Sequence, residues 1–165
     1  LSRHLNMLLV EEQPLLRKTV SMTARSLGLG TVHEAATVQV AERLLRERAF
    51  QGAVIAIDCG VQSGCHYNLE LLDKVRNGMS ASDATIPIAV MVDQATTDLM
   101  QELRDRQVSR VILKPFRAKI LLEAFEQMSG GAACAEARVV ANLIGNAQKP
   151  ARRAPSMVAS LKELL

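Results

Sequence analysis

Four charged side chains stand directly after short apolar runs, where parallel strands would bring them to one edge of a sheet. Glu11 and Glu12 follow the first such run, and Asp58 and Lys114 follow two later ones. Carboxylate oxygens suit a hard divalent cation such as Mg²⁺, and a cation would relieve the repulsion among crowded acids. A carboxylate beside Mg²⁺ can attack a phosphoryl group, and a lysine can neutralise a phosphoryl oxygen. The pattern indicates phosphoryl transfer, with Asp58 as the candidate acceptor.

Apolar runs and helical periodicity alternate along the first 128 residues of the chain. We expect strands at 5–10, 31–36, 52–57, 86–92 and 109–113. We expect helices at 14–27, 37–48, 69–76, 96–106 and 117–128. This alternation predicts an α/β fold, a doubly wound parallel sheet with helices on both faces and right-handed crossovers. In such a sheet the working site lies at the carboxyl ends of the strands, where the four charged residues fall.

The length of 165 residues is enough for one ordinary domain and a short appendage. A content of 48% hydrophobic and 22% charged residues favours a packed core over disorder. We place the domain at 1–128 and the appendage at 129–165. The excess of Lys and Arg over acids in that appendage equals the net charge of +3 of the whole chain. It is expected to be a basic tail or linker, partly helical, or the start of a truncated output region.

Composition disfavours several classes of function. The chain has no Trp, one Tyr and three Phe, so it lacks the rings on which single-stranded nucleic acids stack. No recognition-helix pattern surrounds Arg152 and Arg153, so nucleic acid is not an expected partner of this fragment. No apolar run is long enough to span a bilayer, and 1–6 lacks the apolar stretch of a secretory signal. Three cysteines without zinc-like spacing indicate reduced thiols, and we expect a cytoplasmic protein with no membrane contact.

Simpler interpretations exist for some of these side chains. Asp58 could be a strand-end acid that only caps the next segment, and its functional interpretation depends on the other motifs. Asp93 also follows an apolar run and could lie at the rim of the pocket, but we interpret it as a solvated loop residue. Cys59, Cys65 and His66 lie in one loop but lack a fourth ligand at zinc-like spacing, so a metal site there is disfavoured.

Four motifs, in order, resemble those of response-regulator receiver domains of bacterial two-component systems. They are LLVEEQP at 8–14, AVIAID at 53–58, IPIAVMV at 86–92 and VILKPF at 111–116. The resemblance spans roughly 6–128. It implies a (βα)5, flavodoxin-like fold with five parallel strands in the order 2-1-3-4-5.

The resemblance also implies roles for the charged residues. Glu11, Glu12 and Asp58 would hold Mg²⁺. Asp58 would accept a phosphoryl group from a histidine kinase or phosphotransfer protein, and Lys114 would contact that group. Such a chain is a phosphoacceptor signalling domain that switches a partner interaction, not an enzyme with a turnover substrate. The last two helices would be the partner surface, with homodimerisation as one use of it.

Glu at both strand-one acidic positions, 11 and 12, is a mild departure from the receiver pattern, and two residues and one loop depart further. Val92 stands where receivers usually have a Thr or Ser whose hydroxyl binds the phosphoryl group, and Val111 stands where they usually have a switching aromatic. The loop at 59–68 is about two residues longer than usual and contains no proline. Two functions therefore stay open: a phosphorylatable receiver with an unusual output, and a phosphorylation-independent pseudo-receiver that acts as a protein-binding or dimerisation module. An independent hydrolase ranks last, because no organised triad is visible.

Overall fold

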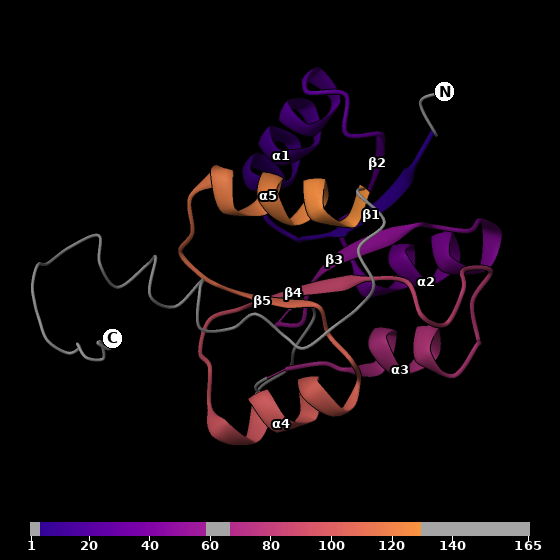
Figure 1. Cartoon of the computed structure of the whole chain (residues 1–165), viewed down its shortest axis with the longest axis vertical. Helices are drawn as coiled ribbons and strands as arrows, with labels where there is room; N and C mark the ends of the chain where they lie inside the picture. Colours follow the sequence, from indigo (N-terminus) through magenta and orange to yellow (C-terminus); the bar gives the residue numbers. More distant parts are fainter. Residues whose placement is uncertain (1–3, 59–66, 130–165) are drawn as a thin grey trace, which may run out of the picture.

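The computed structural model describes residues 4–58 and 67–129, in which five strands alternate with five helices (Figure 1). The strands are β1 (Asn6–Val10), β2 (Thr31–Ala35), β3 (Gly52–Ala56), β4 (Ile88–Val92) and β5 (Arg110–Leu113). The helices are α1 (Pro14–Ser26), α2 (Val38–Glu47), α3 (Glu70–Arg76), α4 (Thr97–Asp105) and α5 (Ala118–Ser129). The alternation expected from the sequence is confirmed. The expectations for the loop at 59–66 and the tail at 130–165 lie outside the described residues.

The five strands form one parallel sheet in the order β2-β1-β3-β4-β5, which confirms the predicted topology. Central strands β3 and β4 consist only of Gly and apolar residues, and every one of their residues is buried. Burial on both faces explains why these segments are continuous apolar runs and not alternating patterns. The strand order reverses between β1 and β3, which is where ligand and reaction sites lie in sheets of this type.

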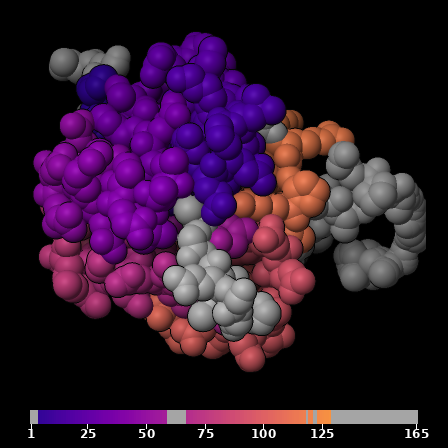
Figure 2. All heavy atoms as spheres, turned by 180° about the vertical axis from the view of Figure 1, so that it is seen from behind, coloured from indigo at the N-terminus to yellow at the C-terminus, as the bar shows by residue number. Residues whose placement is uncertain are grey.

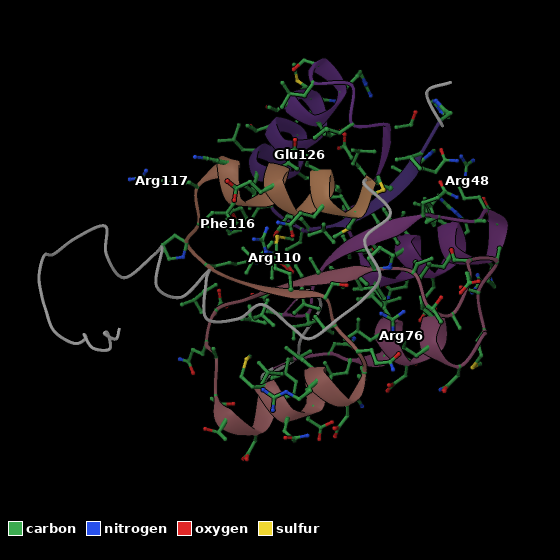
Figure 3. The ribbon with its side chains drawn as sticks, in the orientation of Figure 1. Arg48, Arg76, Arg110, Phe116, Arg117 and Glu126 are labelled. Atoms are coloured by element: carbon green, nitrogen blue, oxygen red, sulfur yellow. The ribbon has the colours of Figure 1, made fainter. Side chains whose placement is uncertain are left out.

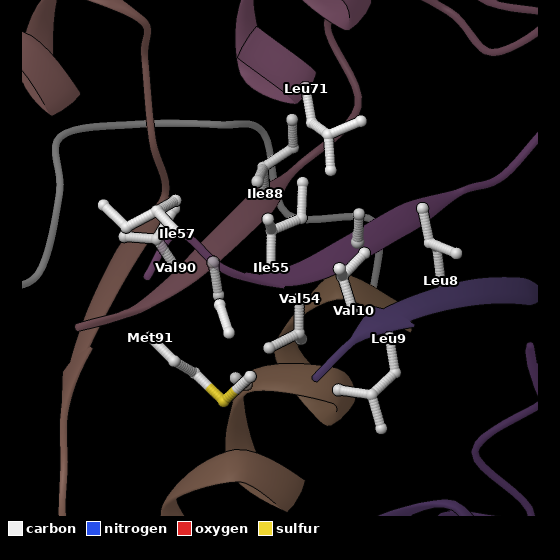
Figure 4. Close-up of a cluster of buried hydrophobic side chains, with 14 of the residues drawn as sticks. Leu8, Leu9, Val10, Val54, Ile55, Ile57, Leu71, Ile88, Val90 and Met91 are labelled. Carbon is white, nitrogen blue, oxygen red and sulfur yellow. The ribbon is translucent and has the colours of Figure 1, made fainter. Parts of the chain in front are cut away.

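Helices cover both faces of the sheet. Helices α1 and α5 pack together on one face, and α2, α3 and α4 lie on the other (Figure 1). Alternating residues of the strands supply the two halves of the core. In Figure 4, Leu9 and Val54 point toward one face, and Leu8 and Ile55 point toward the other. Seen from behind, the early segments and the segments around α3 and α4 occupy separate areas of the surface (Figure 2).

Local sequence signals explain where the helices begin and end. Pro14 opens α1, where a missing backbone N–H has no cost. The Thr37 and Thr96 side chains cap α2 and α4, each accepting a backbone N–H at 3.2 Å. Gly30 has φ +108°, and a Cβ at this position would lie 2.5 Å from the carbonyl oxygen of Leu5. A glycine is therefore required where the chain turns from α1 into β2.

Strand β4 begins at Ile88 and not at residue 86, as the sequence had suggested. Pro87 has no N–H to donate to the sheet, so the ladder cannot start before it. The backbone N–H of Ile86 instead donates to the Asp83 carbonyl oxygen at 3.3 Å, within the preceding turn. The other strands agree with the predicted ranges to within one residue at each end.

Arg76, at the end of α3, ties several segments together at the edge of the sheet opposite the strand carboxyl ends (Figure 3). Its guanidinium donates to the carbonyl oxygens of Ala84 and Ile86 at 2.7 and 2.8 Å, just before β4. It also donates to those of Arg106 and Gln107 at 2.8 and 3.1 Å, just after α4. The C-terminal end of α4 is therefore anchored to α3 by charged hydrogen bonds.

Candidate functional site

The sheet brings three of the predicted site residues to one edge. In the parallel ladder Val10 lies beside Ile55, so Glu11 and Asp58 follow neighbouring strand ends. The backbone N–H of Glu11 donates to the Ala35 carbonyl oxygen at 3.0 Å, which keeps this residue at the end of the ladder. Lys114 follows β5 directly, and its Lys114–Pro115 peptide bond is cis.

Lys114 lies between the two carboxylates. Its Nζ atom is 3.2 Å from both Oδ1 and Oδ2 of Asp58, to which it donates hydrogen bonds. The same Nζ is 3.2 Å from Oε2 of Glu11. The Glu11 side chain is 1% exposed, whereas those of Lys114 and Asp58 are 15% and 22% exposed. The Asp58 carboxylate is thus within reach of solvent, and its two charged neighbours lie deeper.

The Glu11 carboxylate is only partly satisfied. Its Oε1 accepts the backbone N–H of Gln13 at 3.0 Å. Its buried Oε2 faces Lys114 without the geometry of a hydrogen bond. The local backbone is held by Arg17, whose Nη1 donates to the Glu11 carbonyl oxygen at 2.7 Å. A buried carboxylate oxygen with a cation as its neighbour is a fixed source of negative potential at this edge.

The electrostatics of the site keep Lys114 charged. Burial alone would lower the pKa of Lys114, because it disfavours the ammonium form. The negative charges of Glu11 and Asp58 outweigh this effect and raise the pKa above the ordinary lysine value. The lysine therefore supplies a stable positive charge beside the Asp58 carboxylate.

Asp93 is exposed to solvent, as expected, and it lines the same cavity as Asp58. Hydrogen bonding toward the Asp58 carboxyl, then partial burial and the negative charge of Asp58, raise the pKa of Asp93. The sequence signal was present, since Asp93 follows β4 as Asp58 follows β3, but an acid after a strand is common in solvated loops.

A cavity of about 440 Å³ lies beside Asp58 on the side of α4. Three carboxylates line it, together with hydroxyl, amide and apolar side chains. The lining residues are Ile57, Asp58, Tyr67, Val92, Asp93, Gln94, Thr96, Asp98 and Leu99. Asp58 therefore has Lys114 and Glu11 on one side and a cavity lined by two further acids on the other.

Both valines that depart from the receiver pattern lie in the core. Val92 ends β4 and is 3% exposed, and Val111 in β5 is 1% exposed. Val92 lines the cavity beside Asp58 with methyl groups only. No hydroxyl is available from this position to bind a group on Asp58.

The three-carboxylate ligand set expected for Mg²⁺ is assembled only in part. Among residues 4–58 and 67–129, no three His, Cys, Asp or Glu side chains are grouped so that they could hold a metal ion. Glu11 and Asp58 share Lys114 as a neighbour, whereas the side chain of Glu12 is exposed. Mg²⁺ usually takes one or two carboxylates and completes its shell with water and phosphate oxygens. Glu11 and Asp58 fit that need chemically, since both carboxylates lie beside the same lysine.

Solved structures of receiver domains have the same fold. The receiver domain of Francisella response regulator 1452 has a TM-score of 0.65 at 13% identity, over 78% of this chain and 98% of that one. The chemotaxis response regulator CheY4 of Vibrio cholerae has a TM-score of 0.63 at 21% identity, over 76% and 99%. The non-phosphorylated receiver domain of HemR from Leptospira biflexa has a TM-score of 0.64 at 22% identity, over 75% and 93%.

These structures define the class of the fold, that of the response-regulator receiver domain. Neither a protein-family model nor a curated protein sequence matches the chain. None of the described helices is long and apolar enough to cross a membrane.

Proposed function

We propose that this chain is a two-component receiver that accepts a phosphoryl group on Asp58 and thereby switches the interaction with a partner. The observation that supports this function is the placement of Lys114, whose Nζ lies 3.2 Å from both oxygens of Asp58 and from Oε2 of Glu11. Because this ammonium lies between two carboxylates, it can neutralise a phosphoryl group that is transferred to Asp58, the more exposed of the two.

The reaction forms one bond and breaks one. An Oδ atom of Asp58 attacks the phosphorus atom of a phosphohistidine, in the histidine kinase or phosphotransfer protein expected from the sequence. The P–N bond breaks, its electron pair stays on the imidazole nitrogen, and that nitrogen takes a proton from water. The Lys114 ammonium shifts toward the added negative charge and donates a hydrogen bond to a phosphoryl oxygen.

Glu11 and Asp58 are the residues that would hold Mg²⁺, with Glu12 reaching the ion only if its exposed side chain turns inward. The ion would neutralise phosphoryl oxygens during transfer. Glu11 contributes a buried carboxylate that cannot itself be phosphorylated from solvent, because it is 1% exposed. This difference in exposure selects Asp58 as the acceptor. The homodimer through the last two helices and the cytoplasmic location stay predictions.

The test is phosphorylation by acetyl phosphate, with and without Mg²⁺, followed by intact mass spectrometry of the full chain. We expect a Mg²⁺-dependent gain of one phosphoryl group in the wild type and none in Asp58→Ala. The matched control is Asp105→Ala, which removes an exposed acid from α4 and should leave the gain unchanged. No gain in the wild type at saturating donor and Mg²⁺ would refute the proposed acceptor.

A pseudo-receiver is the second candidate, and specific observations favour it. Val92 offers no hydroxyl to a phosphoryl group, and a further acid, Asp93, lines the same cavity as Asp58. In this case the chain would have a single conformation and would bind its protein partner without being phosphorylated. Wild-type protein that cannot be phosphorylated, yet still binds its partner, would support this function.

A further inference from the structure

The side of Asp58 that faces the cavity has no hydrogen-bond donor from the side chain that ends β4. That side chain is Val92, which lines the cavity with methyl groups only. A phosphoryl group carries three acceptor oxygens, and the Lys114 ammonium lies on the other side of Asp58. The cavity of about 440 Å³ has room for a phosphoryl oxygen and several waters, since one water takes about 30 Å³ of liquid volume. An oxygen on this side therefore needs a donor from elsewhere in the chain.

Tyr67 is held next to Asp58 by its neighbours in the chain. The Asn68 backbone N–H donates to the carbonyl oxygen of Ile57, so Tyr67 lies close to the point where the chain leaves β3. The Asn68 side chain accepts the backbone N–H of Glu70 at 2.9 Å, which fixes the same segment at the start of α3. Tyr67 also packs against the core, and it lines the same cavity as Asp58. Backbone and ring thus both keep this residue at the edge of the site.

We propose that Tyr67 binds the phosphoryl group: its hydroxyl donates a hydrogen bond, on the cavity side, to a phosphoryl oxygen on Asp58, in place of the hydroxyl that Val92 lacks. This inference deepens the proposed function and rests on it. A phenol carries its O–H at the end of an apolar ring, so the ring can stay packed on the core while the hydroxyl reaches polar groups in the cavity.

The other donors in the described lining of the cavity are less suited to this role. The Thr96 hydroxyl accepts the Leu99 backbone N–H at 3.2 Å as the cap of α4, which holds it at the start of the helix. The Gln94 side chain is exposed, so water competes for its amide. Tyr67 is only partly exposed, and its hydroxyl has no hydrogen-bond partner among the residues that the structure describes. A hydrogen bond from it to a charged oxygen is therefore net favourable.

The charges around the cavity increase the importance of a neutral donor. Asp93 and Asp98 line the cavity, and its described lining includes no basic side chain. Both acids repel the negative charge that a phosphoryl group adds to Asp58. The Tyr67 O–H offsets part of this repulsion with a specific attraction, which does not require a charged group on this side of the site.

The first measurement is the affinity for beryllofluoride, which binds an aspartate carboxylate in the manner of a phosphoryl group, by titration calorimetry with Mg²⁺. Tyr67→Phe retains the ring and its packing and removes only the O–H, so we expect about tenfold weaker binding. The matched control is Thr96→Ala, which removes the other hydroxyl from the described lining and should change the affinity by less than about twofold. Equal affinities of the wild type and Tyr67→Phe would overturn the proposed role of Tyr67.

The second measurement is the fluorescence of Tyr67 in the wild type. The chain has one Tyr and no Trp, so tyrosine emission comes from this residue alone. A hydrogen bond from a phenol to an anionic acceptor quenches its emission. We expect the emission to fall during the beryllofluoride titration with the same midpoint as the calorimetric signal, and to stay constant in Asp58→Ala.

The fluorescence titration needs no substitution at position 67, so it tests the contact even if Tyr67→Phe does not fold. Unchanged emission in wild-type protein that has bound beryllofluoride would contradict the hydrogen bond from Tyr67. Failure of the proposed function looks different, because neither the wild type nor Tyr67→Phe would then bind beryllofluoride at all.

Discussion

The two halves of the strand edge around Asp58 are built in opposite ways. On the side of β1 and β5, Glu11 and Lys114 are largely buried, joined by an ion pair of 3.2 Å and held by backbone hydrogen bonds. On the side of β4, Asp93 is exposed beside a cavity, and α4 has two buried side chains, Leu99 and Leu103. We call the first the rigid half, because burial and backbone hydrogen bonds hold its charges in place. We call the second the mobile half, because it is exposed, borders a cavity and has few buried side chains to fix it.

This difference separates the residues that we propose for phosphoryl transfer from the segment that would change conformation after it. Phosphoryl transfer needs groups that are already oriented, because reorganisation during the reaction adds to its barrier. A switch needs an element with two arrangements of similar free energy, and such elements come from the weakly packed parts of a fold. Asp58 and Lys114, which we propose for transfer, agree with the receiver pattern, whereas Val92 and Val111 do not. The missing hydroxyl at Val92 therefore leaves the proposed acceptor in place.

The rigid half should show the largest effect on stability. Lys114→Met leaves the buried Glu11 carboxylate without its cation, and removal of one partner from a buried ion pair costs about 3 kcal/mol. We expect the free energy of unfolding to fall by about this amount, measured by urea denaturation with far-ultraviolet circular dichroism.

Lys119→Met is the matched control for Lys114→Met. Lys119 is 82% exposed and lies 4.0 Å from Glu123, so its loss should change the free energy of unfolding by less than about 0.5 kcal/mol. If Lys114→Met were as stable as Lys119→Met, the ion pair with Glu11 would not hold the rigid half together, and the contrast between the two halves would fail.

The mobile half can be given the missing hydroxyl. Val92→Thr keeps the volume of the side chain and places an O–H group beside Asp58, where Val92 now lines the cavity. We expect a loss of about 1 kcal/mol in stability from the buried hydroxyl. We also expect about threefold tighter binding of beryllofluoride, an anion that binds carboxylates as an acyl-phosphate analogue, measured by titration calorimetry with Mg²⁺. Val90→Thr, in the same fully buried strand but farther from the strand end, should lose similar stability without the gain in affinity. Equal affinities of the two variants would show that position 92 does not reach the ligand.

The fold could be predicted from the sequence because its signals are local and repeated. Continuous apolar runs at β3 and β4, Pro14 at the start of α1 and glycines after its end each fix one element. The crossover rules then leave few topologies. Glu11, Asp58 and Lys114 were found because each one follows a strand, and the parallel sheet brings strand ends together.

Details that depend on side-chain direction could not be predicted in this way. Glu11 and Glu12 are adjacent acids, yet the first is buried and the second is exposed, because the backbone still follows the ladder at Glu11. The place of Asp93 at the cavity that Asp58 lines depends on how the chain leaves β4, which no residue type specifies. An aspartate after a strand is compatible with a solvated loop and with the edge of a site, and only the three-dimensional arrangement distinguishes them.

The smallest expected effect lies at β2, on the edge strand remote from the β4 side of the site, where His33 reports on the stability of the fold alone. His33 Nε2 is 3.0 Å from Asn6 Oδ1, and its Nδ1 is 3.5 Å from Nη1 of Arg48. Arginine can only donate, so the imidazole is neutral, with its proton on Nε2 toward Asn6. Burial, then the positive charges of Arg48 and His4, lower the pKa of His33 below 6.5.

The sign of the pH effect follows from this lowered pKa. Between the folded pKa and 6.5, the unfolded chain binds a proton that the folded chain does not, so acidification favours unfolding. The stability contributed by neutral His33 is complete above pH 6.5 and is lost as the pH falls through the folded pKa. We expect the wild type to lose stability more steeply than His33→Gln between pH 6.5 and the folded pKa of His33, as measured by urea denaturation at each pH. The carboxylates are the same in both proteins, so the difference reports on His33. A parallel pH dependence of the two proteins would mean that His33 does not sense acid. If beryllofluoride affinity at constant pH also differed between them, the far edge of the sheet would be coupled to the mobile half at β4, contrary to the separation of the two halves.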